Sequence, residues 1–572
     1  MKTTQTRAIT ALGLTGALAL LAHDPTPARA CGGFFCSQVP VDQTGEQILF
    51  GMGDGKITAS ILINYAGEAD DFAWVLPVAS RPDITLGSPT AFQRLDQRTQ
   101  PVFNLNWDSR NAQCNWWWLY PPMASESDPD STDGGTRGVT VVAEKEVGPF
   151  QTVVLDSTNT DDLIAWLDEN DYDQPPETRP LIDHYVRQGM MFVALRLLKD
   201  EPTGAIQPIT LTFEEPNPCV PLVLTQVAAS PDMPVQLYLA SQHRVAPSNW
   251  MHVVLNEKKI DWLNGGSNYD DVVTQAVDEA AGHAFVTEYA GPSSILDDLL
   301  YRDGQFDLER LRQIEDPADY IDELMNQGFP RDGSVIAQLR KHIPMPAELA
   351  TEGVTEQQFY NNIRGYMDRL GDDFVFDPAA LTAALDERVI TPLKDAQELV
   401  DARPYFTRLY TTVSPEEMTR DPIFTENPDL PDVNNVRTAT AVPTCGTDPN
   451  SPPESVLITL SNDEQILIRG PFQMTWPEIT YPDPVPNEPA AERIELIGTS
   501  GPPTLVHPSQ VGAVDVALDV KPPSEVITDL TSGVIPRPVD HPKTSSSGCM
   551  GGSLSGLLAG LSLLWLVVRR RR

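Results

Sequence analysis

Apolar and polar residues alternate from residue 57 to residue 65, and the apolar side chains stand at every second position. A period of two is typical of a strand with one buried face. Residues 47–50 supply a preceding strand, and the glycine-rich stretch 51–55 between them predicts a hairpin turn. A third strand is predicted over 72–78, so this region is expected to open as a meander.

Helical patterns then alternate with short apolar runs. Helices are predicted over 161–170 and 181–188. The apolar runs predict strands over 191–198, 209–213, 220–228, 235–240 and 251–255. A mixed α+β fold is the simplest interpretation.

Beyond Gly265 the hydrophobic period becomes helical. An apolar stripe over 272–280 predicts a helix that is capped by Asn268 and ends before Gly282, and a strand follows over 283–289. Helices are expected to continue to about residue 405. Asp316-Pro317 and Asp377-Pro378 each combine a capping carboxylate with a proline at the first helical position.

Prolines become frequent after residue 421. A hairpin is predicted from 456–460 and 465–468, and further strands over 494–497 and 514–520. Proline and serine in 521–548 predict an extended tether. The predicted fold class is therefore α+β, with an antiparallel β-rich N-terminal domain (31–265), a mainly helical lobe (266–420) and a Pro-rich β C-terminal region (421–520).

The N-terminus carries an export signal. Lys2 and Arg7 flank the start of an apolar run over 8–22, and Ala28 and Ala30 are small residues at the positions that a signal peptidase reads. Residues 1–30 are thus predicted to be a signal peptide that is cleaved between Ala30 and Cys31. A lipoprotein signal is the alternative, but Ala28 and Arg29 do not suit it.

The C-terminal segment 549–572 is apolar and ends in Arg569, Arg570, Arg571 and Arg572. The apolar stretch 550–568 is close to the roughly 20 residues that a membrane-spanning helix needs. The positive-inside rule keeps the arginines in the cytoplasm, which places the body beyond the inner membrane. A buried core helix is the alternative reading, and the terminal position and the flanking arginines argue against it.

The charge excludes one class of partner. The chain holds 80 acidic and 40 basic residues, for a net charge of −40, so nucleic acid is repelled. A solvated acidic surface is the first interpretation, and a surface that collects cations is the second.

Export makes disulfides permissible, and five cysteines lie in the exported body: Cys31, Cys36, Cys114, Cys219 and Cys445. An odd number leaves at least one thiol free or paired between chains. Spacing alone does not settle the pairing. The candidate pairs are Cys31 with Cys36 and Cys114 with Cys219.

Motifs for metal binding and catalysis are weak. The histidines His184, His243, His252, His283, His342 and His507 are scattered, without zinc spacing. The acidic stretch 128–135 has carboxylates suited to Ca²⁺ but lacks EF-hand spacing, and a flexible acidic loop is the favoured reading. No GxSxG elbow lies in the body. The expectation is no cofactor and no assigned catalytic residue, with enzyme status open but disfavoured.

Three consecutive tryptophans, Trp116, Trp117 and Trp118, form the most unusual aromatic cluster. Adjacent residues on a strand point to opposite faces, so one ring is expected near the surface unless both faces are covered. Stacking on a sugar or a partner is one interpretation. Core packing beside Cys114 is the other.

Several blocks resemble a bacterial family called domain of unknown function 2330. They are CGGFFC, PVDQTGEQILF, INYAGEADDFAWVLPV, NYDDVVTQAVDEAAGHAFVTEYAG, FTRLYTTVSPEEMTRDPIF and NPDLPDV, in this order between Cys31 and about residue 436. The resemblance implies kinship, export and a shared core. It implies no reaction.

The tail resembles the myxobacterial C-terminal sorting signal, with Gly548-Cys549, an apolar helix and an arginine cluster. This resemblance implies cleavage near Cys549 by a membrane sorting protease, lipid on that cysteine, and transfer from the inner membrane to the cell surface. We therefore expect an exported, surface- or membrane-anchored binding or structural module of the envelope, which meets the export machinery and the membrane. An extracellular hydrolase acting on polysaccharide or peptide is the alternative.

Overall fold

The computed structural model describes residues 42–536, except 54, 67–72, 109–140, 171, 173–175, 199–206, 372–373, 449–451 and 476–477. The predicted signal peptide, the acidic stretch 128–135, the tryptophan cluster and the sorting tail all lie outside the described residues. Predictions about them stay predictions.

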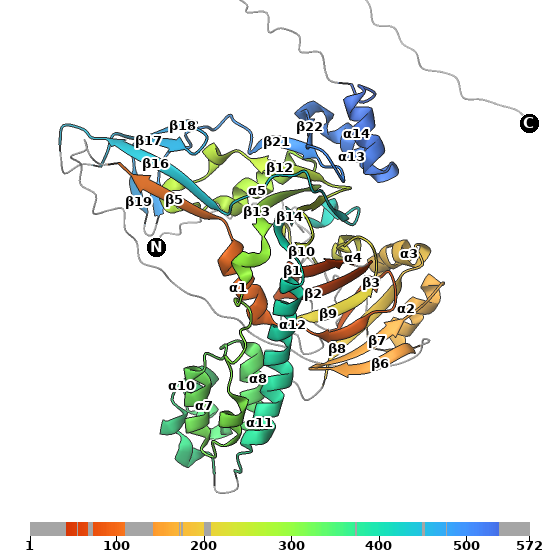
Figure 1. Ribbon diagram of the computed structural model, residues 1–572, viewed down its shortest axis with the longest axis vertical. Helices are drawn as coiled ribbons and strands as arrows, with labels where there is room; N and C mark the ends of the chain where they lie inside the picture. Colours follow the sequence, from red (N-terminus) through yellow and green to blue (C-terminus); the bar gives the residue numbers. More distant parts are fainter. Residues whose placement is uncertain are drawn as a thin grey trace, which may run out of the picture.

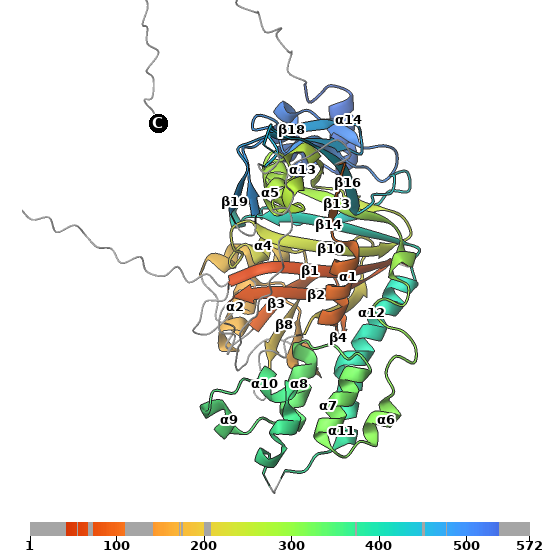
Figure 2. The ribbon, with the colours of Figure 1, turned by 90° about the vertical axis from the view of Figure 1, so that its left-hand side faces the viewer.

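A ten-stranded mixed sheet forms the centre of the protein, in the order β22-β21-β12-β13-β14-β10-β1-β2-β9-β4 (Figure 1). Only β1–β10 and β12–β13 are parallel among its neighbouring pairs. Figure 2 shows β14, β10, β1 and β2 following one another across the sheet. The strands are β1 (Asp42–Gly53), β2 (Lys56–Ala66), β4 (Asp83–Leu86), β9 (Ile209–Glu214), β10 (Met233–Ser241), β12 (Met251–Leu255), β13 (Ala284–Pro292), β14 (Tyr405–Val413), β21 (Ala491–Leu496) and β22 (Thr504–Val506).

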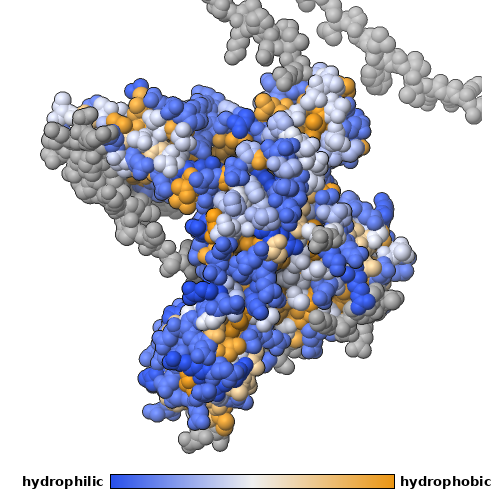
Figure 3. All heavy atoms as spheres, viewed as in Figure 1, coloured by the Kyte–Doolittle hydropathy of each residue, from blue (hydrophilic) through white to orange (hydrophobic). Residues whose placement is uncertain are grey.

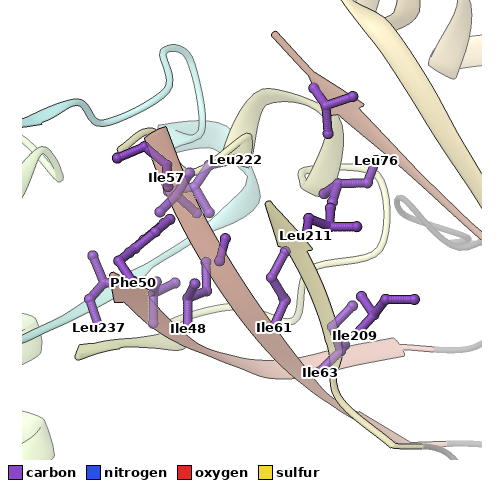
Figure 4. Close-up of a cluster of buried hydrophobic side chains, with 14 of the residues drawn as sticks. Ile48, Phe50, Ile57, Ile61, Ile63, Leu76, Ile209, Leu211, Leu222 and Leu237 are labelled. Atoms are coloured by element: carbon purple, nitrogen blue, oxygen red, sulfur yellow. The ribbon is translucent and has the colours of Figure 1, made fainter. Parts of the chain in front are cut away.

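The predicted first hairpin is confirmed. β1 and β2 pair antiparallel through to Gly53 opposite Lys56, so the turn is tighter than the predicted 51–55. The alternating residues of β2 are buried on one side, with Ile57 and Ile61 among them (Figure 4). Ile48 and Phe50 of β1 join the same core. Burial of these side chains stabilises the hairpin by roughly 25 cal/mol for each Å² of apolar surface removed from water.

The predicted meander is wrong at its third strand. β3 (Ala73–Val78) pairs with β8 (Met191–Leu197) in a separate four-stranded sheet, β3-β8-β7-β6, with β6 (Val141–Val147) and β7 (Phe150–Leu155). Every residue of β3 is buried, because the large sheet covers one face and the helices α2 (Thr160–Glu169) and α3 (Arg179–Arg187) cover the other. Both helices were predicted.

The apolar run 220–228 was predicted as a strand and is instead largely helix and turn. α4 (Leu222–Thr225) has four buried residues. A short apolar run is compatible with a buried strand and with a buried helical turn. In this segment, tertiary packing stabilises the helical turn.

A helical lobe is inserted between β13 and β14 and projects from the sheet (Figure 1). The predicted starts are confirmed, since Asp316 and Asp377 both accept backbone N–H groups at their helix N-termini. The lobe contains α6 (Leu308–Arg312), α7 (Pro317–Asn326), α8 (Gly333–His342), α9 (Ala347–Thr351), α10 (Glu356–Asn361), α11 (Pro378–Leu385) and α12 (Thr391–Asp401).

Two helices outside the lobe cover the sheet near the pockets described below. They are α1 (Pro89–Thr99) and α5 (Tyr269–Asp278), the latter connecting β12 to β13. The predicted cap of α5 is absent, because Asn268 uses its Oδ1 to accept the N–H of Asp261 instead.

The C-terminal region adds another four-stranded sheet, β18-β17-β16-β5, and confirms the predicted hairpin of β17 and β18. Its strands are β5 (Val102–Trp107), β16 (Val436–Thr444), β17 (Ser455–Leu460) and β18 (Gln465–Arg469). Two-stranded ladders pair β11 (Val245–Pro247) with β15 (Phe424–Glu426) and β19 (Gln473–Thr475) with β20 (Glu478–Thr480).

Two predictions for the C-terminal end are wrong. Residues 514–520 belong to the helix α13 (Val511–Val520), and the predicted tether 521–548 contains the helix α14 (Pro523–Thr531). Apolar residues at every second position from 514 to 520 imitate a strand, but the buried residues Val511, Val514 and Leu518 follow helical spacing, and Val516 and Val520 are exposed. The ten-stranded sheet also takes strands from all three predicted ranges, 31–265, 266–420 and 421–520.

The surface in Figure 3 is mostly hydrophilic, with apolar residues in small scattered groups. Across the described ranges, no helix has the length and apolar character to cross a bilayer. The predicted membrane segment 550–568 lies beyond these ranges.

The docking of α14 gives a testable prediction. Val526 is fully buried, so Val526→Ala is expected to lower the free energy of unfolding by about 2 kcal/mol through lost burial and a residual cavity. The matched control is Val520→Ala, because Val520 is 77% exposed and should change the free energy by less than about 0.5 kcal/mol. Equal effects of the two substitutions in urea unfolding would contradict the docking.

Candidate functional site

Polar residues interrupt the apolar core on one face of the central strands. Gln236 and Tyr238 of β10 lie directly opposite Tyr410 and Arg408 of β14. Alternate residues of a strand share a face, so the four side chains lie together. Gln236, Tyr238 and Arg408 are each at most 6% exposed. This arrangement places a buried guanidinium in the middle of the sheet.

A bulge in β13 supplies the counter-ion. The register of β13 with β14 shifts between Thr287 and Tyr289, which leaves Glu288 as the extra residue. Its carboxylate accepts a hydrogen bond from Nε of Arg408. Bulges change the direction of side chains. At this bulge, Glu288 lines the first of the two pockets described below and Thr287 lines the second.

Arg408 of β14 contacts side chains of three other elements, β13, α1 and β10. Its Nη2 lies 2.8 Å from Oδ1 of Asp96 on α1, and its guanidinium carbon lies 5.4 Å from the ring centre of Tyr238. Burial raises the pKa of Glu288, and the charge of Arg408 opposes that rise. The ion pair therefore compensates two charges that would each be costly to bury alone.

The first pocket has a volume of about 360 Å³ and lies over this ion pair. Aromatic rings and carboxylates face each other across it. The hydroxyl of Tyr410 donates to Asp270 at 3.1 Å, and Phe103 packs against Tyr269 with ring centres 5.7 Å apart. Its polar and aromatic lining residues are Glu46, Gln47, Asn64, Asp96, Gln100, Phe103, Gln236, Ser267, Tyr269, Asp270, Glu288, Arg408 and Tyr410.

Gly266 permits the close packing of the Phe103 wall. It adopts a φ of +84°, and a Cβ at this position would lie 2.3 Å from Cδ2 of Phe103. Glycine is the residue that meets both requirements without strain. The glycines before α5 therefore shape the pocket wall.

The second pocket, of about 420 Å³, lies where β12 and β13 separate. The two parallel strands pair only as far as Val253 and Val286, after which β12 stays paired with β21 and β13 with β14. The carboxyl ends of parallel strands are the usual place for ligand crevices in α/β sheets. Phe103 and Tyr269 line both pockets, which makes the two pockets neighbours.

A chain of hydrogen bonds crosses the second pocket. Nη2 of Arg244 donates to Oγ1 of Thr287 at 3.0 Å, and the same oxygen lies 2.9 Å from Nε2 of His252. Nδ1 of His252 lies 3.2 Å from Oε2 of Glu495. Because the carboxylate of Glu495 can only accept, Nδ1 of the neutral imidazole carries the proton and donates to it, and the Thr287 hydroxyl, which accepts from Arg244, donates to the unprotonated Nε2.

The electrostatics agree with this assignment. Burial lowers the pKa of His252, so the imidazole is neutral near pH 7. Burial alone would raise the pKa of Glu495, but hydrogen bonds from His252 and Arg493 outweigh it and the pKa is lowered. The pair is thus a neutral imidazole and a carboxylate.

Most residues singled out from the sequence lie outside the described part of the chain. This applies to Ala30, Cys31, Cys36, Cys114, Gly548 and Cys549, to the three tryptophans and to the four terminal arginines. His252 is described and belongs to the second pocket. Within the described ranges, no group of three or more His, Cys, Asp or Glu side chains is arranged to hold a metal ion.

The predicted pairing of Cys219 with Cys114 is wrong, because Cys219 is a free thiol. Cys219 forms a β-bridge with Ile423 and is enclosed beside Asp421, and burial raises the pKa of its thiol well above the usual value. Cys445 is disulfide-bonded, and its partner lies outside the described residues.

The sequence interpretation missed Arg244, Thr287, Glu288, Arg408 and Glu495. A signal was present for some of them, since Glu288 and Arg408 each interrupt an otherwise apolar strand. A charge inside such a run marks a buried ion pair or a site. The grouping of Arg244 with Glu495 left no local signal, because about 250 residues separate them.

The fold and the pockets define an α+β protein with two adjoining polar pockets on one central sheet. Residues 25–335 match the family described as "Uncharacterized protein conserved in bacteria (DUF2330)", and the chain belongs to this family. The searches of curated proteins and of solved structures returned no match. The sequence blocks after residue 335 and the tail are outside this match, so their resemblances stay predictions.

A buried carboxyl in the first pocket gives a pH-dependent prediction. Glu46 is 3% exposed, and burial raises its pKa to about 7. Between about pH 4.5 and 7 the folded state holds a proton that the unfolded state releases, so the unfolding free energy falls as pH rises through this window and then levels off.

Glu46→Gln should remove this loss. The free energy of unfolding of the variant minus that of the natural protein is expected to increase by about 3 kcal/mol from about pH 4 to pH 8. Urea unfolding of both proteins at each pH measures this difference. The measurement near pH 4 is the internal control, because the carboxyl is protonated in both states there. Parallel pH profiles of the two proteins would contradict the assignment.

Proposed function

We propose that this protein is an exported, surface-anchored binding module of the bacterial envelope, and that the two pockets form its ligand site. The observation that carries the proposal is the set of buried polar side chains beneath the pockets. Replacing a buried ion pair by apolar residues is often neutral or stabilising. A buried ion pair is therefore weak evidence of a stabilising role, and ligand recognition gives Arg408 and Glu288 a function.

The pocket walls support a polar organic ligand. Volumes of about 360 and 420 Å³ suit a small molecule. Half-buried rings such as Tyr269 offer stacking faces, while carboxylates and amides offer hydrogen bonds that fix orientation. The shared wall of Phe103 and Tyr269 would let one ligand contact both pockets.

Export and anchoring are part of the proposal. The N-terminal signal and the Gly548-Cys549 tail support a path through the export machinery, a transient inner-membrane helix and a sorting protease. The net charge of −40 suits a protein that stays solvated outside the cytoplasm.

Anchoring is tested at the tail. Cys549→Ala is expected to leave the tail uncut, because the residue expected to carry the lipid is missing, and intact-mass analysis of the membrane fraction measures this. Ser547→Ala is the matched control and should be processed normally. Normal processing of the Cys549→Ala protein would defeat the sorting proposal.

Ligand binding is tested by a thermal-shift screen of small polar molecules, with hits measured by calorimetry. Tyr269→Ala is expected to weaken binding of each hit about tenfold, because it removes the ring that lines both pockets. The control is Tyr301→Ala, which removes a half-buried tyrosine that packs against Phe306 in the helical lobe. Hits that bind both variants equally would place the ligand site elsewhere.

The second candidate function is an extracellular hydrolase. One observation favours it: Thr287, His252 and Glu495 have the order of a nucleophile, a base and an orienting carboxylate. In the same screen, mass analysis separates the candidates, since a binding module returns its ligand unchanged. A hydrolysed hit that survives Thr287→Ser but not Thr287→Val would favour the hydrolase.

A further inference from the structure

Arg244 is a buried cation without a counter-ion in contact. It is 6% exposed and lines the second pocket. Its Nη1 donates to the carbonyl of Pro431 at 2.7 Å and its Nη2 to Thr287, while its Nε has no hydrogen-bond partner. Among the described residues, no carboxylate forms an ion pair with it.

The nearest carboxylates are engaged elsewhere. Glu495 accepts from His252 with one oxygen and from Arg493, at 3.0 Å, with the other. Asp432 is exposed and accepts the hydroxyl of Tyr405 at 2.6 Å. Burial lowers the pKa of Arg244, and the negative charges of Glu495 and Asp432 oppose this only in part. Burying a charge without a counter-ion in contact raises the free energy of the folded protein, and an anion in contact would offset this increase.

The charged residues that line the second pocket also favour an anionic ligand. The lining of the pocket contains three arginines, Arg244, Arg437 and Arg493, against three carboxylates. The chain as a whole has twice as many acidic as basic residues. The second pocket is therefore enriched in positive charge relative to the rest of the protein.

The remaining wall is apolar. Phe103, Val254 and Val433 line the pocket and are half-buried, whereas the lining residues Val253, Leu255, Ile260 and Val286 are already buried in the core behind them. An inorganic ion would leave this surface without a partner, whereas an organic ligand would cover it.

We propose that the second pocket binds an organic carboxylate, with its anionic group on Arg244 and its apolar body against Phe103, Val254 and Val433. This rests on the proposed function and names the ligand class for one of its two pockets. A carboxylate accepts charge-assisted hydrogen bonds from a guanidinium, and only two of the five N–H groups of Arg244 donate to acceptors in the described part of the protein, one from Nη1 and one from Nη2.

The test is calorimetry and thermal shift on the purified full-length chain at constant ionic strength. The probes are hexanoate, benzoate, acetate, inorganic phosphate and the neutral isostere hexanamide. Hexanoate and benzoate are expected to bind at least about tenfold more tightly than acetate, phosphate or hexanamide, because only they satisfy both Arg244 and the apolar wall.

Variants assign the effect to one residue. Arg244→Gln should weaken hexanoate about tenfold or more, and Arg244→Lys should keep part of the preference for the anion over the amide. The control is Arg81→Gln, which removes the same charge from an exposed position before β4. In the natural protein, hexanoate should also protect Arg244 from phenylglyoxal, as read by peptide mass.

Three outcomes would overturn the inference. They are equal binding of hexanamide and hexanoate, a preference for phosphate, and modification of Arg244 that hexanoate does not slow. If the small-molecule screen still yields ligands that depend on Tyr269, the organic-carboxylate assignment fails while the proposed binding function stands. If neither experiment yields a ligand, both fail.

Discussion

The contact of Arg408 with its neighbours is the interaction on which the site depends. The guanidinium of Arg408 on β14 holds Glu288 of β13, Asp96 of α1 and the ring of Tyr238 on β10. Without Glu288 the buried guanidinium would keep, among the described residues, only Asp96, whose side chain is 43% exposed, as a counter-ion, and removing one partner of a buried ion pair is strongly destabilising. The bulge that releases Glu288 from strand pairing is therefore as necessary as the arginine.

The same bulge links the two pockets. Glu288 closes the floor of the first pocket, and its neighbour Thr287 enters the hydrogen-bonded chain of the second. The sheet opens where β12 and β13 stop pairing, which gives His252 and Arg244 access to a shared space. The bulge in β13 and the separation of β12 from β13 thus create the two pockets, on a sheet whose buried side chains are mostly apolar.

Several elements could be predicted because their causes are local. The β1–β2 hairpin follows from alternation around glycines, and the starts of α7 and α11 follow from an aspartate before a proline. β3 was correctly predicted as a strand but its partner was not, and the predictions for α13 and for the tether that contains α14 were wrong. An apolar run shows that a segment is buried, but the neighbours that bury it decide its partner and often its conformation.

The sequence by itself determined the α+β class, the starts of two capped helices and the acidic net charge, because periodicity, capping and charge can be read from the residues of each segment. Only the tertiary structure decided that strands from distant parts of the chain share one sheet and that Arg244, His252, Thr287 and Glu495 meet. The physical reason is that hydrogen bonds and ion pairs act over a few ångströms in space. Along the chain, these residues are separated by 8 positions (Arg244 and His252) to 251 positions (Arg244 and Glu495).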